Sequence, residues 1–327
     1  MIYSLAITGP TASGKTSISI NLAKTLCAEI ICCDSMQIYK EMDIGTAKAT
    51  AEERRVVPHH VLDFLSPSED FSAEEYRKVA LLAAEDITSR GKIPIFVGGT
   101  GLYIDTVMRR EVEGVPASSR EYRDRILASV YTEAEADELW KRLFTVDPES
   151  AAGIHKNNVR RVIRALEIYD ATGKPKSYFD KLSKEENSDI KVGMITLDFH
   201  NRDNLYSRVD ARVDDMMREG LVSEVRSLYE RELLKKNTTA AQAIGYKEII
   251  SYLDGEITLD EATELIKLST RRYAKRQLTW FRHETGARRL YIDGEDGKLR
   301  SGEEIINEAR LMADGLIKGF INEVKGT

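Results

Sequence analysis

The chain has few cysteines, and their spacing fits neither a disulfide scaffold nor a zinc ribbon. Its 327 residues include only Cys27, Cys32 and Cys33. Two of these are chain neighbours that cannot easily pair, and no CxxC spacing occurs. The chain also lacks any apolar run approaching the ~20 residues that span a bilayer. We therefore expect a reduced protein with no membrane partner.

Targeting signals and a uniformly basic coat are missing as well. The start, MIYSLAITGP, has neither the basic region nor the cleavage site of a signal peptide. The formal net charge is −6, which argues against a uniformly basic nucleic-acid coat. It leaves room for a local basic groove, because recognition depends on where the charge lies. The composition is that of an ordinary globular protein, and we expect a soluble, cytoplasmic one.

Short apolar runs alternate with helical patterns over the first hundred residues. Helical spacing covers 17–26 and 72–89, and the predicted strands are Tyr3–Thr8, Glu29–Cys33, His60–Phe64 and Ile93–Val97. Strands that alternate with helices predict βαβ units and a parallel sheet, with ligands at the carboxyl ends of the strands. The fold class predicted is α/β, a P-loop NTPase-like parallel sheet flanked by helices.

The pattern changes after about residue 110. Residues 112–119 read as a linker, and residues 120 to about 184 are helical with no strand-like run. A strand returns at Val192–Leu197, followed by helical stretches at 211–229 and 259–280. We predict an α/β catalytic core of residues 1–111 and 188–327, and a smaller all-helical insertion domain of residues 112–187.

A phosphate-binding loop follows the first predicted strand and opens the first helix. The motif G-x-x-x-x-G-K-[ST] is matched by Gly9, Pro10, Thr11, Ala12, Ser13, Gly14, Lys15 and Thr16. Its glycines let backbone N–H groups turn toward phosphate oxygens, and the helix N-terminus adds partial positive charge. Lys15 would reach the terminal phosphate and the Thr16 hydroxyl would ligate Mg²⁺. The motif does not say whose phosphate is bound.

Two further features end predicted strands beside this loop. Asp34 directly follows the second strand and is a candidate general base, although a turn or helix-cap aspartate also suits that position. After it, Gln37 offers an amide to a base edge and Tyr39 a ring for stacking. The fourth strand ends in a glycine turn, 98–101, where the Thr100 hydroxyl could hold a second part of a substrate.

Six motifs in order resemble the tRNA dimethylallyltransferase (tRNA isopentenyltransferase) family in its compact bacterial form. They are GPTASGKT, DSMQIY, FVGGTGLY, RALEIYDATGKP, QAIGYKE and KRQLTWFR, which together span residues 9 to 282. The resemblance implies transfer of a dimethylallyl group from dimethylallyl diphosphate to N6 of adenine 37 in tRNA, beside the anticodon. The phosphate loop would then hold the diphosphate leaving group with Mg²⁺.

The resemblance also assigns roles to single residues. Asp34, Thr100 and Arg212 are the implied catalytic residues, although Arg208, four residues earlier on the same helix face, competes with Arg212 for the diphosphate. The partner would be the anticodon stem-loop, bound by a monomer. The residues assigned to tRNA are Ser35, Met36, Gln37, Arg123, Arg160, Arg161, Arg164, Gln242, Lys247, Lys275, Arg276 and Arg282.

Several alternatives stay open on the sequence alone. The basic segment 271–289 and the cluster around Arg161 are either a tRNA surface or solvated charged helices. Among the aromatics of that segment, Trp280 and Phe281 either stack on bases or belong to the core. Rival functions are a small-metabolite kinase, a prenyltransferase for free adenine nucleotides, and a non-catalytic nucleotide-dependent RNA-binding switch. None of these three uses all of the observed features.

Overall fold

The chain forms two compact units. The computed structural model describes residues 1–110, 112–116, 118–183, 189–235 and 238–326. The larger unit comprises residues 1–107 and 189–327, and the smaller one comprises residues 108–188. Residues 111, 187 and 188, which flank the predicted domain boundaries, lie outside the described ones. No helix in the described ranges is long and apolar enough to cross a membrane.

The larger unit is built on one parallel sheet of six strands. The strand order is β3-β2-β4-β1-β5-β6, and every adjacent pair is parallel. The strands are β1 (Ile2–Thr8), β2 (Ala28–Cys32), β3 (His59–His60), β4 (Ile93–Gly98), β5 (Ile190–Asp198) and β6 (Arg288–Tyr291). The α/β class predicted from the sequence is confirmed.

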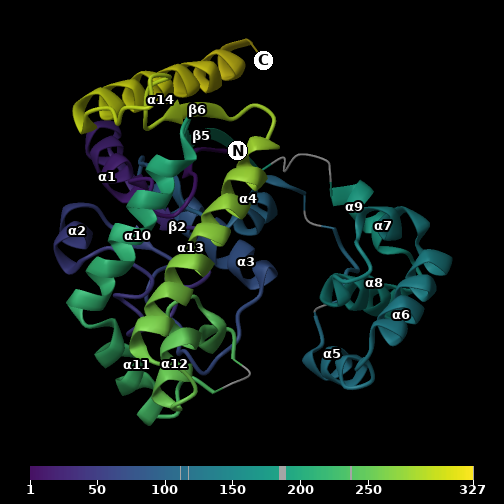
Figure 1. The fold of residues 1–327 in the computed structure, drawn as a ribbon. Helices are drawn as coiled ribbons and strands as arrows, with labels where there is room; N and C mark the ends of the chain where they lie inside the picture. The colour runs from purple at the N-terminus through teal and green to yellow at the C-terminus, as the bar shows by residue number, and fades with distance from the viewer. Residues whose placement is uncertain (111, 117, 184–188, 236–237, 327) are drawn as a thin grey trace. The chain divides into compact units, whose positions relative to one another are not determined.

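Helices cover the two faces of this sheet (Figure 1). Helices α1 (Lys15–Leu26) and α14 (Gly302–Gly326) contact each other and the strands, and bury Leu5, Ile30 and Ile195. Strand residues that alternate with these point to the opposite face, where α3 (Ala73–Ser89) packs. A capping box of Ser72 and Glu75 starts α3, where the sequence predicts a helix to begin. Two short helices also belong to this unit: α2 (Ala51–Val56) lies between β2 and β3, and α4 (Gly101–Met108) follows β4.

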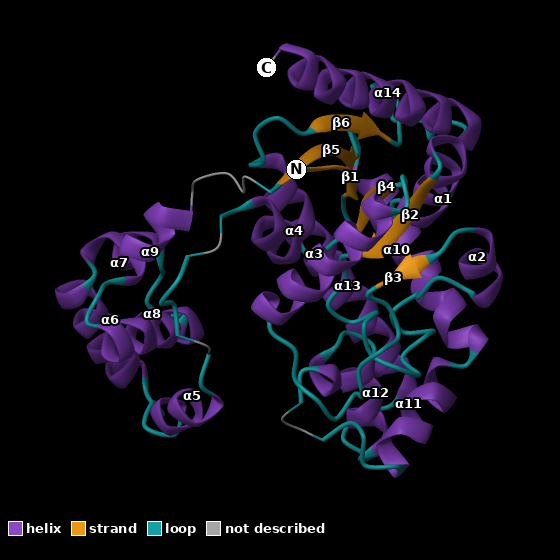
Figure 2. Cartoon of the chain, turned by 180° about the vertical axis from the view of Figure 1, so that it is seen from behind, coloured by secondary structure: helices purple, strands orange, loops and turns teal. Residues whose placement is uncertain are grey.

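A second group of helices lies next to the carboxyl ends of the strands. It contains α10 (Arg202–Glu219), α11 (Leu221–Glu230), α12 (Tyr246–Leu253) and α13 (Leu259–Arg282), with the turn η1 (Ala240–Gln242) between α11 and α12. Figure 2 shows α11 and α12 side by side. Their own apolar core includes Ile38, Tyr39, Val225 and Ile249. This second core fixes the segment after β2 against the helices.

The smaller unit is helical throughout its described residues. Its helices are α5 (Arg120–Leu127), α6 (Glu133–Val146), α7 (Pro148–Gly153), α8 (Val159–Thr172) and α9 (Lys176–Ser183). Leu143, Val162 and Leu166 form the centre of its core. Helix α8 ends at Gly173, which adopts the left-handed conformation common at the ends of helices.

Three local predictions were wrong. The strand expected at His60–Phe64 is only two residues long, because Val61 and Asp63 adopt positive φ values that end it. The helical stretch 211–229 is divided at Gly220, whose φ of 106° ends α10. Strand β6 was missed, since its four residues carry two arginines and show no apolar run.

Gly98 is required at the end of β4 by a close backbone contact. A β-carbon on Gly98 would lie 2.1 Å from the carbonyl oxygen of Cys33. We expect Gly98→Ala to lower the free energy of unfolding, measured by urea denaturation, by about 1–3 kcal/mol or more. The control is Gly319→Ala on the exposed face of α14, where an added β-carbon meets nothing within 4 Å. That change should stabilise by roughly 0.5–1 kcal/mol; equal stabilities for the two variants would contradict the packing argument.

Candidate active site

The phosphate loop lies between β1 and α1, as predicted. Gly14 caps the helix with φ 93°, and Ala12 also has a positive φ of 62°. The guanidinium Nε of Arg208 donates to the carbonyl oxygen of Ala12 at 2.8 Å and so holds this unusual conformation. Successive backbone N–H groups in such a turn form a concave site for an anion.

A lysine and an arginine bring positive charge to this loop. Lys15 Nζ donates to the carbonyl oxygens of Gly9 and Pro10 at 3.0 and 2.7 Å. Burial, and secondly the charge of Arg212, lower the pKa of Lys15 to about 7, against the opposing effect of Asp34. Burial likewise lowers the pKa of Arg212. Two cations so poorly hydrated favour an anionic ligand that would bind both.

The structure separates the two candidate arginines of α10. Arg212 lines the cavity beside the phosphate loop, whereas Arg208 is engaged with the backbone of Ala12. Arg212 is therefore the one positioned to contact a bound ligand, and Arg208 supports the loop.

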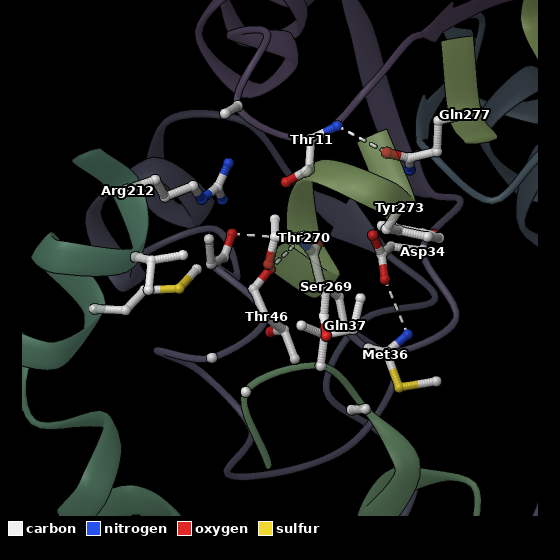
Figure 3. Close-up of a pocket in the computed structure, with 18 of the residues that line it drawn as sticks. Thr11, Asp34, Met36, Gln37, Thr46, Arg212, Ser269, Thr270, Tyr273 and Gln277 are labelled. Carbon is white, nitrogen blue, oxygen red and sulfur yellow. Dashed lines mark hydrogen bonds between the residues drawn. The ribbon is translucent and has the colours of Figure 1, made fainter. Parts of the chain in front are cut away.

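Asp34 lies two residues beyond β2 and faces the same cavity (Figure 3). Its Oδ1 accepts a hydrogen bond from the backbone N–H of Met36 at 2.9 Å, so the aspartate also has the turn role considered above. Thr100 Oγ1 accepts from the backbone N–H of Ser35 at 3.1 Å. Burial, then the charge of Asp34, raise the pKa of Tyr273 on α13, which keeps that phenol protonated.

One cavity of about 550 Å³ joins these groups. Its walls come from the phosphate loop, the segment after β2, α10, α12 and α13. Several of the other residues assigned to catalysis or tRNA also line this cavity: Ser35, Met36, Gln37, Gln242, Lys247 and Arg276. Thr100, Lys275 and Arg282 are not among its lining residues. The sequence therefore identified much of one cavity from motifs that lie far apart in the chain.

Several of the other predicted residues have partners within the protein. Arg282 forms two hydrogen bonds to the buried carboxylate of Asp198, at 2.7 and 3.0 Å. In the smaller unit, Arg164 donates to Glu167 and to the carbonyl oxygen of Pro116. Among the predicted residues that do not line the cavity, the exposed ones on α8 and α13 are Arg160, Arg161 and Lys275. In α5, Arg123 is half-buried and donates to the carbonyl oxygen of Ser119 at 3.3 Å.

The structure also places the aromatic residues considered for base stacking. Tyr39 does not stack in the site, because its side chain is fully buried in the second core. Of the two alternatives left open for Phe281, the structure supports the core, and Trp280 packs over Gly101. Gln37 lines the cavity, with its amide nitrogen donating to the carbonyl oxygens of Thr46 and Ala47 at 3.0 and 3.3 Å.

Sequence reasoning missed a loop that forms part of the wall. Residues 45–47 line the cavity, and the carboxylate of Glu224 on α11 accepts from the backbone N–H groups of Asp43, Ile44 and Gly45 at 2.7–3.1 Å. Tyr246 donates its hydroxyl to the same carboxylate at 2.5 Å. The only signal in the sequence was a glycine and small residues after a strand, which is too common to identify a site.

Comparison with known proteins gives the family. A family model described as IPP transferase matches residues 37–284. The chain belongs to the IPP transferase family. It is 46% identical over 299 residues to a protein of Thermoanaerobacter sp. (strain X514) named tRNA dimethylallyltransferase, covering 89% of this chain and 92% of that one. A protein of the same name from Geobacillus thermodenitrificans is 50% identical over 280 residues, covering 86% and 87%.

Solved structures agree with this IPP transferase assignment. The full-length tRNA isopentenylpyrophosphate transferase of Bacillus halodurans matches with a TM-score of 0.70 and 41% identity, over 98% of this chain and 99% of that one. A eukaryotic dimethylallyltransferase described as acting on tRNA matches with a TM-score of 0.74 and 34% identity, over 89% and 74%. The resemblance read from the six motifs is confirmed.

Proposed function

We propose that this protein transfers a dimethylallyl group from dimethylallyl diphosphate to N6 of adenine 37 in tRNA. The observation that carries the proposal is the cavity in which a phosphate loop, two cations and one carboxylate meet. The cations suit the diphosphate leaving group, and Asp34 suits the acceptor. The relatives with the same motifs are named for this reaction.

The leaving group would bind at the phosphate loop. When the bond from the allylic carbon to the diphosphate oxygen breaks, its electron pair leaves with the diphosphate and positive charge develops on carbon. Lys15 and Arg212, both at the loop, would stabilise the negative charge. A bound diphosphate would favour the protonated form of Lys15, whose pKa is otherwise lowered to about 7, so both groups would be charged when the leaving group departs.

The acceptor nitrogen N6 is a poor nucleophile, because its lone pair is delocalised into the adenine ring. As the bond between N6 and the allylic carbon forms, the Asp34 carboxylate would take the proton that N6 loses. The hydrogen bond from Met36 to Oδ1 orients that carboxylate. Adenine 37 must leave its stack to reach the cavity, at a cost of a few kcal/mol.

We also propose that Mg²⁺ accompanies the diphosphate. Within the described ranges, no cluster of three or more His, Cys, Asp or Glu side chains could hold a metal. Mg²⁺ commonly takes few protein ligands and completes its shell with waters and substrate phosphates. Thr16, which lines the cavity, would supply one oxygen. Mg²⁺ there would neutralise charge on the diphosphate.

The tRNA partner would be held by localised basic surface. Arg160 and Arg161 on α8 of the helical insertion, and Lys275 and Arg276 on α13, have exposed side chains suited to backbone phosphates. Because Arg164 and Arg282 form internal ion pairs, we expect them to support these helices. We further propose that the protein acts on the anticodon stem-loop as a monomer.

The proposed reaction is tested by offering all rival acceptors together. The protein is incubated with radiolabelled dimethylallyl diphosphate, unmodified tRNA, AMP and ATP, with Mg²⁺. Label in tRNA supports the proposal, whereas label in AMP or ATP indicates a free-nucleotide prenyltransferase. Consumption of ATP without transfer of label would favour a kinase, and tRNA binding without any turnover a non-catalytic switch.

The role of Asp34 predicts a loss of rate without a loss of tRNA binding. Asp34→Ala should lower kcat by about 10²–10⁴-fold, the usual contribution of a general base. The Kd for tRNA, measured by filter binding, should stay close to that of the wild type. Turnover near the wild-type level in this variant would remove the base assignment.

The leaving-group assignment predicts that donor affinity and rate fall together. Lys15→Ala and Thr16→Ala should both raise KM for dimethylallyl diphosphate and lower kcat, and chelation of metal by EDTA should mimic Thr16→Ala. Inorganic diphosphate binding, followed by calorimetry, checks the same residues without turnover. Full activity after metal removal would contradict the Mg²⁺ proposal.

The basic surface predicts salt-dependent tRNA binding, with a log–log slope of about −0.7 for each phosphate contacted in a single-stranded loop. Arg161→Glu or Arg276→Glu should raise KM for tRNA and flatten that slope by about one unit, with little change for the donor. Lys78→Glu on α3 is the control, since it changes the net charge equally at an exposed site outside the cavity. If the two arginine variants behave like this control, the tRNA path lies elsewhere.

A further inference from the structure

Gln277 is a buried glutamine of α13 that hydrogen-bonds two loops of the cavity. It is 5% exposed, and the argued mechanism gives it no role. Its Oε1 accepts from the backbone N–H of Thr11 at 2.9 Å, and its Nε2 donates to the carbonyl oxygen of Gly99 at 2.9 Å. Figure 3 shows the first of these bonds, at the edge of the cavity. One side chain thus joins the phosphate loop to the glycine turn after β4.

The glycine turn leads directly to the proposed base. Thr100 follows Gly99, and its hydroxyl accepts from the backbone N–H of Ser35, the residue next to Asp34. On the other side, Thr11 begins the run of phosphate-loop residues that line the cavity. The Gln277 amide is therefore a direct link between the segment proposed for the leaving group and the segment that carries the base.

The chemistry of the contact requires an amide. One end faces a backbone donor and the other faces a backbone acceptor, so a carboxylate would repel the Gly99 carbonyl and an apolar side chain would leave both groups unpaired. The fit is also close, since a β-carbon on Gly99 would lie 2.0 Å from Nε2. Gly99 and Gln277 are thus fitted to each other.

We propose that Gln277 is a positioning residue for the transfer reaction, one that sets the placement of the diphosphate-binding loop relative to Asp34. This inference rests on the proposed function. Gln277 acts through Thr11 and Gly99 and transfers no proton itself. Its position on α13, next to the exposed Arg276, places this link on the helix that also presents basic side chains to the cavity.

The test compares Gln277→Met, which keeps the length of the side chain and removes both hydrogen bonds, with Leu278→Met as a matched control. Leu278 is the next residue of α13, is equally buried and packs into the core of the sheet. We expect Gln277→Met to raise the Kd for inorganic diphosphate about tenfold. It should lower kcat by up to about 10²-fold, the cost of a misplacement near 1 Å, and leave KM for tRNA unchanged. Leu278→Met should leave all three values near those of the wild type.

A second variant keeps the inference testable if Gln277→Met does not fold. Gln277→Glu retains the acceptor for Thr11 and loses the donor to Gly99, so it should show the same direction of change. Wild-type diphosphate affinity and kcat in a folded variant would overturn the proposal, as would equal losses in Leu278→Met. Diphosphate binding needs no acceptor, so a failure of transfer to tRNA in the wild type would count against the proposed function and leave this measurement valid.

Discussion

The site depends on a backbone contact between the carboxyl ends of β2 and β4. The N–H of Cys33 donates to the carbonyl of Val97 at 2.7 Å, and the carbonyl of Cys33 accepts from the N–H of Thr100 at 3.1 Å. Gly98 has no side chain to keep these two strand ends apart. Asp34 and Thr100 therefore emerge side by side, next to the phosphate loop that ends β1. Parallel strands place their carboxyl ends at one edge of the sheet, and this backbone contact brings the segments that follow β2 and β4 together.

The positive charges of Lys15 and Arg212 in the cavity favour a bound anion, because burial removes much of the water that would otherwise stabilise them. Burial lowers the pKa of both Lys15 and Arg212, and a neighbouring cation adds to the effect on each: Arg212 acts on Lys15, and Arg208 acts on Arg212. The charge of Asp34 opposes both shifts. A ligand with two or more negative charges at the phosphate loop would relieve that repulsion. The same cations would then stabilise the charge that the leaving group gains, so binding and catalysis draw on one electrostatic arrangement.

Around this centre, three polar side chains hold backbone segments that have no regular secondary structure; Gln277 is buried, and Arg208 and Glu224 are half-buried. Arg208 holds the phosphate loop at Ala12, Gln277 joins that loop to Gly99, and Glu224 collects three backbone N–H groups of residues 43–45. Each contact satisfies groups that neither a helix nor the sheet would pair. Part of the cavity wall consists of loops, and these side chains hold those loops in a defined shape.

The sequence by itself determined the α/β class, the phosphate loop, the position of Asp34 and the family, because each is encoded in local spacing or in an ordered set of motifs. Only the tertiary structure showed that Arg212 lines the cavity while Arg208 contacts the backbone of Ala12, placed Tyr39 in a core, and paired Arg282 with Asp198. It alone revealed Glu224 and Gln277 as partners of loops more than 150 residues away. The physical reason is that the role of a side chain at such a range depends on which backbone groups the fold leaves unpaired beside it. Local periodicity predicts helices and strands, and it does not predict which distant groups become neighbours.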